Sequence, residues 1–203
     1  LYCDETGGDY FDIIEFPDND RKVGVAVGDV VGHGIGAAPL MATVRALLRC
    51  RLAQPGRLDR MIADVNRLLC RDTRVSGSFI TLFYLEVDRL RHTLRWVRAG
   101  HEPALVYSPG TGSFSELKGQ GVALGVEGNL EFLSHELPLA KGPRLIWIGS
   151  DGAWEVENGA GEQFGRERIK QLLAANWTLP AELIIKTVIE EITAFRGNTP
   201  QHD

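Results

Sequence analysis

The chain has 203 residues, 44% of them hydrophobic and 24% charged, with a formal net charge of -5 at pH 7. The composition is typical of a globular protein, and the length suits one well-cored domain. The net negative charge, and the lack of a stretch of basic residues interrupted by aromatic ones, exclude a nucleic-acid-binding surface. No apolar run approaches the length that spans a bilayer, and no signal peptide opens the sequence, so we expect no membrane span.

The first half of the chain predicts a strand and two helices. Valines alternate with small residues over 23–27, which is typical of a strand, and this strand ends at Asp29. Apolar residues then follow helical spacing over 40–52, with Pro39 in the first turn, and again over 58–69. Each helix has one apolar stripe, which predicts that each lies on a sheet.

The second half predicts a block of strands followed by helices. Its strands are expected at 79–87, 94–97, 104–107, 131–137 and 145–148, and its helices at 166–175 and 180–195. The apolar run 145–148 predicts a strand buried on both faces. Short connections rich in glycine and proline favour antiparallel pairing. We therefore expect an α+β fold with two stacked antiparallel sheets flanked by helices.

Four aspartates stand out by their positions. Asp9, Asp29 and Asp151 each lie at the glycine-rich end of an apolar run, and Asp203 closes the chain. Two carboxylates about 5 Å apart would repel by roughly 3 kcal/mol at an effective dielectric constant near 20. Divalent cations, which prefer oxygen ligands, would offset this repulsion. The alternative is that aspartates beside glycines are only turn formers.

The three cysteines do not form a metal or disulfide motif. Cys3, Cys50 and Cys70 make an odd number and show no C-x-x-C spacing. Cys50 and Cys70 lie in helical patterns, which favours buried free thiols in a reducing compartment. We therefore expect a cytoplasmic location.

Several motifs occur in order along the chain: GGDYFD, VAVGDVVGHGIGAAPLMA, FITLFYLEVD, WVRAGHEPALV, GQGVALGV, LIWIGSDGAWEVEN and GEQFG. The sequence resembles the SpoIIE/RsbU-type bacterial serine phosphatases of the metal-dependent PPM superfamily over nearly its whole length. The resemblance implies an α-β-β-α sandwich and a single phosphatase domain over 1–203 that lacks its first and last strands.

The resemblance also implies a metal site built from acidic residues. Asp9, Asp29 and Asp151 match catalytic metal ligands of the family, and Asp29 matches the residue that bridges both metals. The backbone carbonyl of Val30 and the side chain of Asp203 complete the implied set. An all-oxygen shell suits two Mn²⁺ or Mg²⁺ ions better than zinc, and such ions can activate a water for phosphate ester hydrolysis.

For several other residues near these motifs, the sequence allows more than one role. His33 could protonate the leaving oxygen or only support its turn, and His101 is expected to form structural hydrogen bonds. Asp12 could reach a metal through water, but a turn-forming role is favoured. Arg45 and Arg49 could meet a phosphate, although solvated arginines on a helix face are the default expectation.

The leading hypothesis is therefore a protein serine/threonine phosphatase. The resemblance implies a phosphorylated protein substrate such as an anti-sigma factor antagonist, an upstream sensor domain, and regulation through dimerisation with 40–52 and 58–69 as moving parts. The alternative is a catalytically silent binding module with the same fold. A diguanylate cyclase reading of GGDYF is disfavoured, because that motif lies well inside its domain and here opens the chain.

Overall fold

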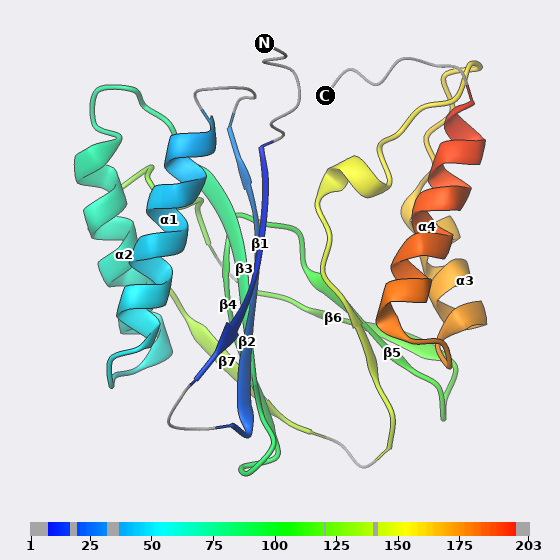
Figure 1. Cartoon of the computed structure of the whole chain (residues 1–203), viewed down its shortest axis with the longest axis horizontal. Helices are drawn as coiled ribbons and strands as arrows, with labels where there is room; N and C mark the ends of the chain where they lie inside the picture. The colour runs from blue at the N-terminus through cyan, green and yellow to red at the C-terminus, as the bar shows by residue number, and fades with distance from the viewer. Residues whose placement is uncertain (1–7, 17–19, 32–36, 120, 140–141, 198–203) are drawn as a thin grey trace. The chain divides into compact units, whose positions relative to one another are not determined.

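The computed structural model describes residues 8–16, 20–31, 37–119, 121–139 and 142–197. The chain divides into two compact units. The first comprises Leu1–Pro103 and Leu117–Ala140, and the second Ala104–Glu116 and Lys141–Asp203. Each unit combines one sheet with two helices (Figure 1).

The sheet of the first unit has five antiparallel strands in the order β1-β2-β3-β4-β7. These strands are β1 (Asp9–Glu15), β2 (Lys22–Val30), β3 (Ile80–Asp88), β4 (Thr93–Ala99) and β7 (Ser134–Pro138). Short connections join β1 to β2 and β3 to β4, whereas α1 and α2 lie between β2 and β3 in the sequence.

Two helices cover one face of this sheet. They are α1 (Ala37–Leu52) and α2 (Leu58–Asp72), which lie side by side in Figure 1. Their buried stripes pack on alternate residues of the strands, and the core they form includes Tyr10, Ile14, Ala26, Val30, Val44, Leu48, Ile62, Val65, Leu69, Ile80, Leu82 and Tyr84. The period of 3.6 in the helices and of 2 in the strands produces this single apolar layer. The predicted helix stripes are confirmed.

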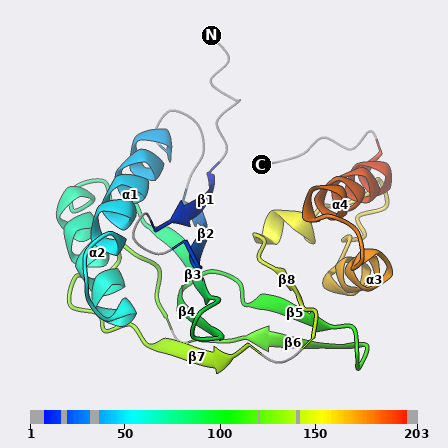
Figure 2. The same ribbon diagram turned by 60° about the horizontal axis from the view of Figure 1, so that its bottom comes forward.

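The second unit holds a three-stranded sheet in the order β6-β5-β8. Its elements are β5 (Ala104–Ser108), β6 (Ser113–Leu117), β8 (Leu145–Trp147), the 3₁₀ helix η3 (Asp151–Ala153), α3 (Arg166–Asn176) and α4 (Ala181–Arg196). Figure 2 shows α3 and α4 beside each other. Leu145 and Trp147 of β8 pack against the cluster that these helices form around Ile169 and Ile184.

The predicted α+β class, with two antiparallel sheets and their helices, is confirmed. Two strands escaped prediction. β6 has only one buried residue, Leu117, so its sequence carries no clear apolar signal. Asp9 opens β1, whereas the sequence interpretation placed it at the end of an apolar run. β1 alternates between buried and exposed residues, which is the pattern of a strand with one face on the core.

Three smaller expectations met different outcomes. All three residues of β8 are partly exposed, so the prediction of a strand buried on both faces is wrong. Cys50 and Cys70 are free thiols as predicted, but neither is buried: Cys70 is half-buried, and Cys50 is exposed because it lies off the apolar stripe of α1. Cys3 lies outside the described residues. Over the described ranges, no helix combines the length and apolar character needed to cross a membrane.

Candidate metal site

Asp9 and Asp29 lie directly opposite each other on β1 and β2. The amide of Val30 donates to the carbonyl of Gly8 at 3.0 Å, which makes Gly8 and Val30 a hydrogen-bonded pair. Antiparallel ladders alternate, so the next pair, Asp9 and Asp29, is non-hydrogen-bonded, with Cα atoms about 4.5 Å apart and side chains close together. The ladder itself therefore brings two carboxylates side by side.

Both aspartates project from the sheet face that α1 and α2 leave uncovered. Their neighbours in sequence, Tyr10 and Val30, point the other way into the core, and successive side chains of a strand alternate between faces. Asp9 is exposed and Asp29 is half-buried. Like charges directly opposite on neighbouring strands destabilise a sheet. A cation that bridges the two carboxylates would reverse this penalty, and hard oxygen donors fit Mg²⁺ or Mn²⁺.

The backbone at Asp29 is held by a side chain of the next strand. The Asp29 amide donates to Oγ1 of Thr81 at 3.1 Å, and Thr81 is its register partner on β3. Next to this contact, Gly28 lies against the main chain of β3, because a Cβ built at Gly28 would come within 2.4 Å of the Thr81 carbonyl oxygen. Gly28 is therefore required here for close approach of two backbones.

Replacing Gly28 by alanine should destabilise the fold by about 1–3 kcal/mol, the usual cost of forcing an extra methyl group into a packed site. The clash is with backbone, which cannot rotate away as a side chain can. Urea unfolding checks the result. Gly110→Ala is the matched control, because a Cβ at Gly110 has nothing within 4 Å. Equal unfolding free energies for the two variants would contradict the close approach at Gly28.

Asp12 is the buried member of a partly exposed ion-pair network between β1 and α1. Its carboxylate accepts two hydrogen bonds of 2.6 Å from Arg49, lies 3.6 Å from Nε of Arg45, and accepts a bond of 3.2 Å from the Tyr10 hydroxyl. Arg49 also donates to the carbonyl of Ile13 at 3.1 Å. The prediction that Asp12 forms a turn is wrong, and so is the prediction that Arg49 is simply solvated. No local pattern in the sequence indicated that one face of β1 lies against α1.

This network changes the acidity of its members. The hydrogen bonds from Arg49 hold the pKa of Asp12 below its ordinary value, and the guanidinium charges of Arg49 and Arg45 act in the same direction. Burial, reinforced by the Asp12 charge, raises the pKa of Tyr10 far above its ordinary value. Asp12 is therefore an anion committed to Arg49, on the opposite face of β1 from Asp9.

His101 meets the expectation of a structural hydrogen bond. The residue is buried, and its Nδ1 lies 2.9 Å from Oγ1 of Thr81. Thr81 thus contacts both Asp29 and His101. Sequence reasoning missed Thr81, because the only signal for it is its register opposite Asp29, which a strand pattern alone does not determine.

The other predicted ligands are placed as follows. Val30 closes β2 with its side chain in the core, and the role of its carbonyl stays a prediction. Asp151 lies in the second unit, where it opens η3, is exposed, and accepts backbone hydrogen bonds of 2.9 Å from Trp154 and Glu155. Asp203 and His33 fall outside the described residues. Within the described part of the chain, no group of three or more His, Cys, Asp or Glu side chains is arranged to hold a metal ion.

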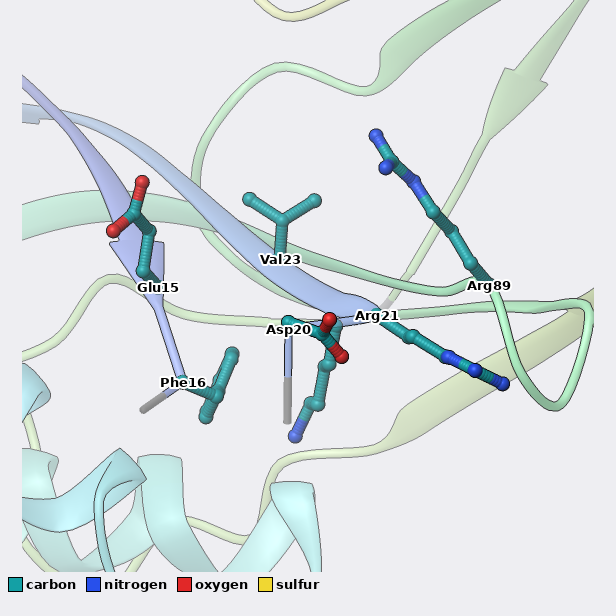
Figure 3. Close-up of a pocket in the computed structure, with 7 residues that line it drawn as sticks. Glu15, Phe16, Asp20, Arg21, Val23 and Arg89 are labelled. Carbon is teal, nitrogen blue, oxygen red and sulfur yellow. The ribbon is translucent and has the colours of Figure 1, made fainter. Parts of the chain in front are cut away.

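A hollow lies at the other end of the β1–β2 ladder. It is lined by Glu15, Phe16, Asp20, Arg21, Lys22, Val23 and Arg89 (Figure 3). Glu15 pairs with Val23, six residues along β1 from Asp9, or about 20 Å at the rise of a strand. The Nζ of Lys22 forms an ion pair with Oε1 of Glu86 at 2.7 Å and lies over the ring of Phe16. The hollow is therefore separate from the aspartate pair.

Comparisons with known proteins agree with the fold. The SiaA-PP2C domain of Pseudomonas aeruginosa superimposes with a TM-score of 0.82, at 22% identity over 98% of this chain and 78% of that chain. RsbX, solved in complex with magnesium, superimposes with a TM-score of 0.66 at 17% identity, over 94% of this chain and 82% of that chain. These likenesses show that the chain has the fold of PP2C-type phosphatase domains.

The sequence comparisons place the chain within this class. The family model for stage II sporulation protein E (SpoIIE) matches residues 19–203, and the chain belongs to the SpoIIE family. Phosphoserine phosphatase RsbU of Bacillus subtilis (strain 168) is 25% identical over 190 residues, which cover 93% of this chain and 54% of RsbU. The chain thus spans about half the length of this relative. The predicted family is confirmed.

Proposed function

We propose that this chain is a metal-dependent protein serine/threonine phosphatase domain that hydrolyses phosphoserine or phosphothreonine on a signalling protein. The observation that carries the proposal is the pairing of Asp9 with Asp29 across a non-hydrogen-bonded position of the β1–β2 ladder. Two carboxylates held together at one edge of a sheet are costly without a cation. A divalent cation held by both carboxylates would offset their repulsion.

The proposed ligands are Asp9, Asp29, the carbonyl of Val30, Asp151 and Asp203, carried over from the family motifs. Membership of the SpoIIE family supports this set, as does a relative solved with magnesium. Two bound Mn²⁺ or Mg²⁺ ions would supply an activated water and neutralise charge on the phosphoryl oxygens. The chain's own contribution is to fix the carboxylates in place, with the backbone of Asp29 tied to Thr81.

The names of the relatives support a substrate class and a setting for this activity. RsbU is named a phosphoserine phosphatase, and a solved relative combines RsbU and RsbW domains in one protein of Mycobacterium tuberculosis. We propose a phosphorylated anti-sigma factor antagonist as the substrate class, in the cytoplasm. Regulation by a sensor domain elsewhere in the protein or by homodimerisation, with α1 and α2 as the moving parts, is part of the same proposal.

Hydrolysis of a phosphoserine peptide should require Mn²⁺ or Mg²⁺. Activity should be lost on chelation with EDTA and return when Mn²⁺ is added in excess, because the reaction depends on the cation for its nucleophile. Phosphate release measures the activity, and calorimetry measures Mn²⁺ uptake. Hydrolysis that survives chelation would contradict the metal mechanism. A chain that takes up no Mn²⁺ and releases no phosphate would instead be the catalytically silent binding module.

A further inference from the structure

The side chain of Thr81 contacts the main chain of Asp29 and the ring of His101. Its hydroxyl accepts from the Asp29 amide at 3.1 Å, lies 3.4 Å from the Asp29 carbonyl oxygen, and lies 2.9 Å from Nδ1 of His101. We call these three contacts the Thr81 brace. All three residues belong to the first unit, on β2, on β3 and just after β4.

The Thr81 hydroxyl is the centre of the Thr81 brace. It accepts a hydrogen bond from the Asp29 amide at 3.1 Å. It also forms a hydrogen bond of 2.9 Å with Nδ1 of His101, in which the donor is set by the tautomer of the imidazole. The contact with the Asp29 carbonyl oxygen, at 3.4 Å, is the longest of the three. In either tautomer the Thr81 brace joins the main chain of Asp29 to His101 through Thr81.

His101 is itself fixed in place. Only 3% of the residue is exposed, and its carbonyl accepts a hydrogen bond from the guanidinium of Arg98. Gly100, immediately before it, has a φ of +75°, and a Cβ there would come within 2.9 Å of the Ala123 amide nitrogen. Only glycine tolerates both conditions. Because its backbone is held on both sides, the ring has little freedom to leave Thr81.

The Thr81 brace acts where the position of the backbone matters most for the aspartate pair. Asp29 is the penultimate residue of β2, and the pairing with β3 ends two residues later, where the Val31 amide donates to the Phe79 carbonyl at 3.0 Å. A shift of its backbone would move its carboxylate away from that of Asp9, its register partner. Hydrogen bonds from outside the ligands commonly orient metal-binding groups in this way.

We propose that Thr81 and His101 are positioning residues: through the Thr81 brace they hold the backbone of Asp29, and so its carboxylate beside Asp9, in the geometry that binds a divalent cation. The proposal rests on the proposed metal-dependent function. A purely structural role for the same contacts would affect the free energy of unfolding and leave cation affinity unchanged.

Calorimetric titration with Mn²⁺ on the whole chain separates the two roles. Thr81→Val removes the hydroxyl and keeps the shape, and should weaken Mn²⁺ binding by about tenfold or more. Thr81→Ser keeps the hydroxyl and should bind like the wild type. Thr93→Val is the matched control, since Thr93 is a half-buried threonine on β4 of the same sheet. It should also bind like the wild type.

His101 variants test the second half of the Thr81 brace. His101→Leu should weaken Mn²⁺ binding by a similar factor, whereas His101→Asn can place an amide oxygen near the Nδ1 position and should restore it. If His101 acts through Thr81, the double variant T81V/H101L should bind no more weakly than T81V alone. Additive losses in the double variant would overturn the coupling between the two residues.

Hydrogen exchange at the Asp29 amide gives a readout without metal. By NMR on the metal-free protein, this amide should exchange faster in Thr81→Val than in the wild type or Thr93→Val. If the wild type binds Mn²⁺ and Thr81→Val binds it with equal affinity, the positioning role of the Thr81 brace is overturned and the proposed function is not. A wild type that takes up no Mn²⁺ would overturn the proposed function and the positioning role with it. If Thr81→Val fails to fold, the His101→Leu and His101→Asn affinities decide by the same criterion.

Discussion

Replacing Asp29 by asparagine should lower phosphopeptide hydrolysis by at least about a hundredfold, because the change removes one of two paired carboxylates that would bind the cation. The same change should leave the metal-free fold intact or make it more stable. Asparagine relieves the repulsion with Asp9, which at an opposite position on neighbouring strands is worth about 0.2–1 kcal/mol. Activity and stability should therefore move in opposite directions.

The measurements are initial rates with Mn²⁺ in excess and urea unfolding in EDTA. Asp72→Asn is the matched control, since Asp72 is an exposed aspartate at the end of α2 in the same unit. It should change neither quantity appreciably. An Asp29→Asn chain that retains most of its activity would remove the aspartate pair from the mechanism. A large loss of metal-free stability would show that Asp29 is a structural residue.

Replacing Asp12 by asparagine should destabilise the fold by about 2 kcal/mol at pH 7, the scale of a buried hydrogen bond to a charged group. Asp12 has only 8% of its side chain exposed and accepts two bonds from Arg49, so the variant loses both the charge and one strong acceptor. Urea unfolding of the variant and the wild type measures the difference.

The pH dependence of this difference has a definite sign. The pKa of Asp12 is lowered in the folded state, chiefly by its hydrogen bonds from Arg49, so the folded state binds the proton less readily than the unfolded chain. The stabilisation is therefore fully present above the unfolded pKa of about 4 and is lost as the pH falls through the lower folded pKa. The gap between wild type and Asp12→Asn should be constant from pH 7 to about pH 5 and should shrink at more acid pH.

Substitutions of two arginines, one bonded to Asp12 and one in an exposed ion pair, test the same network. Arg49→Met leaves the Asp12 carboxylate without its two shortest hydrogen bonds and should destabilise the fold clearly at pH 7. Arg60→Met removes an exposed arginine of α2 whose ion pair with Glu131 is 3.8 Å long, and should have little effect. Equal effects of the two substitutions would contradict the buried network.

Local patterns were sufficient to predict most elements of the fold. The apolar stripe of α2 and the alternation in β2 each depend on residues within a few positions of one another, so they can be recognised without knowing the partner. β6 lacked such a signal because it is largely exposed. The residues of the candidate site were likewise marked by glycine-rich contexts and by the family motifs that contain Asp9, Asp29 and Asp151.

The amino-acid sequence was enough to predict the fold class, the family and the acidic residues of the candidate site. Which of these residues lie next to each other depends on how the strands pair in three dimensions. The register between β1 and β2 sets Asp9 opposite Asp29. Because Asp12 is three residues from Asp9 on the same strand, its side chain points to the other face, where it meets Arg49. A shift of one residue in that register would exchange the two faces of β1. Pairing of this kind joins residues that are distant in the chain, and local propensity carries no information about it.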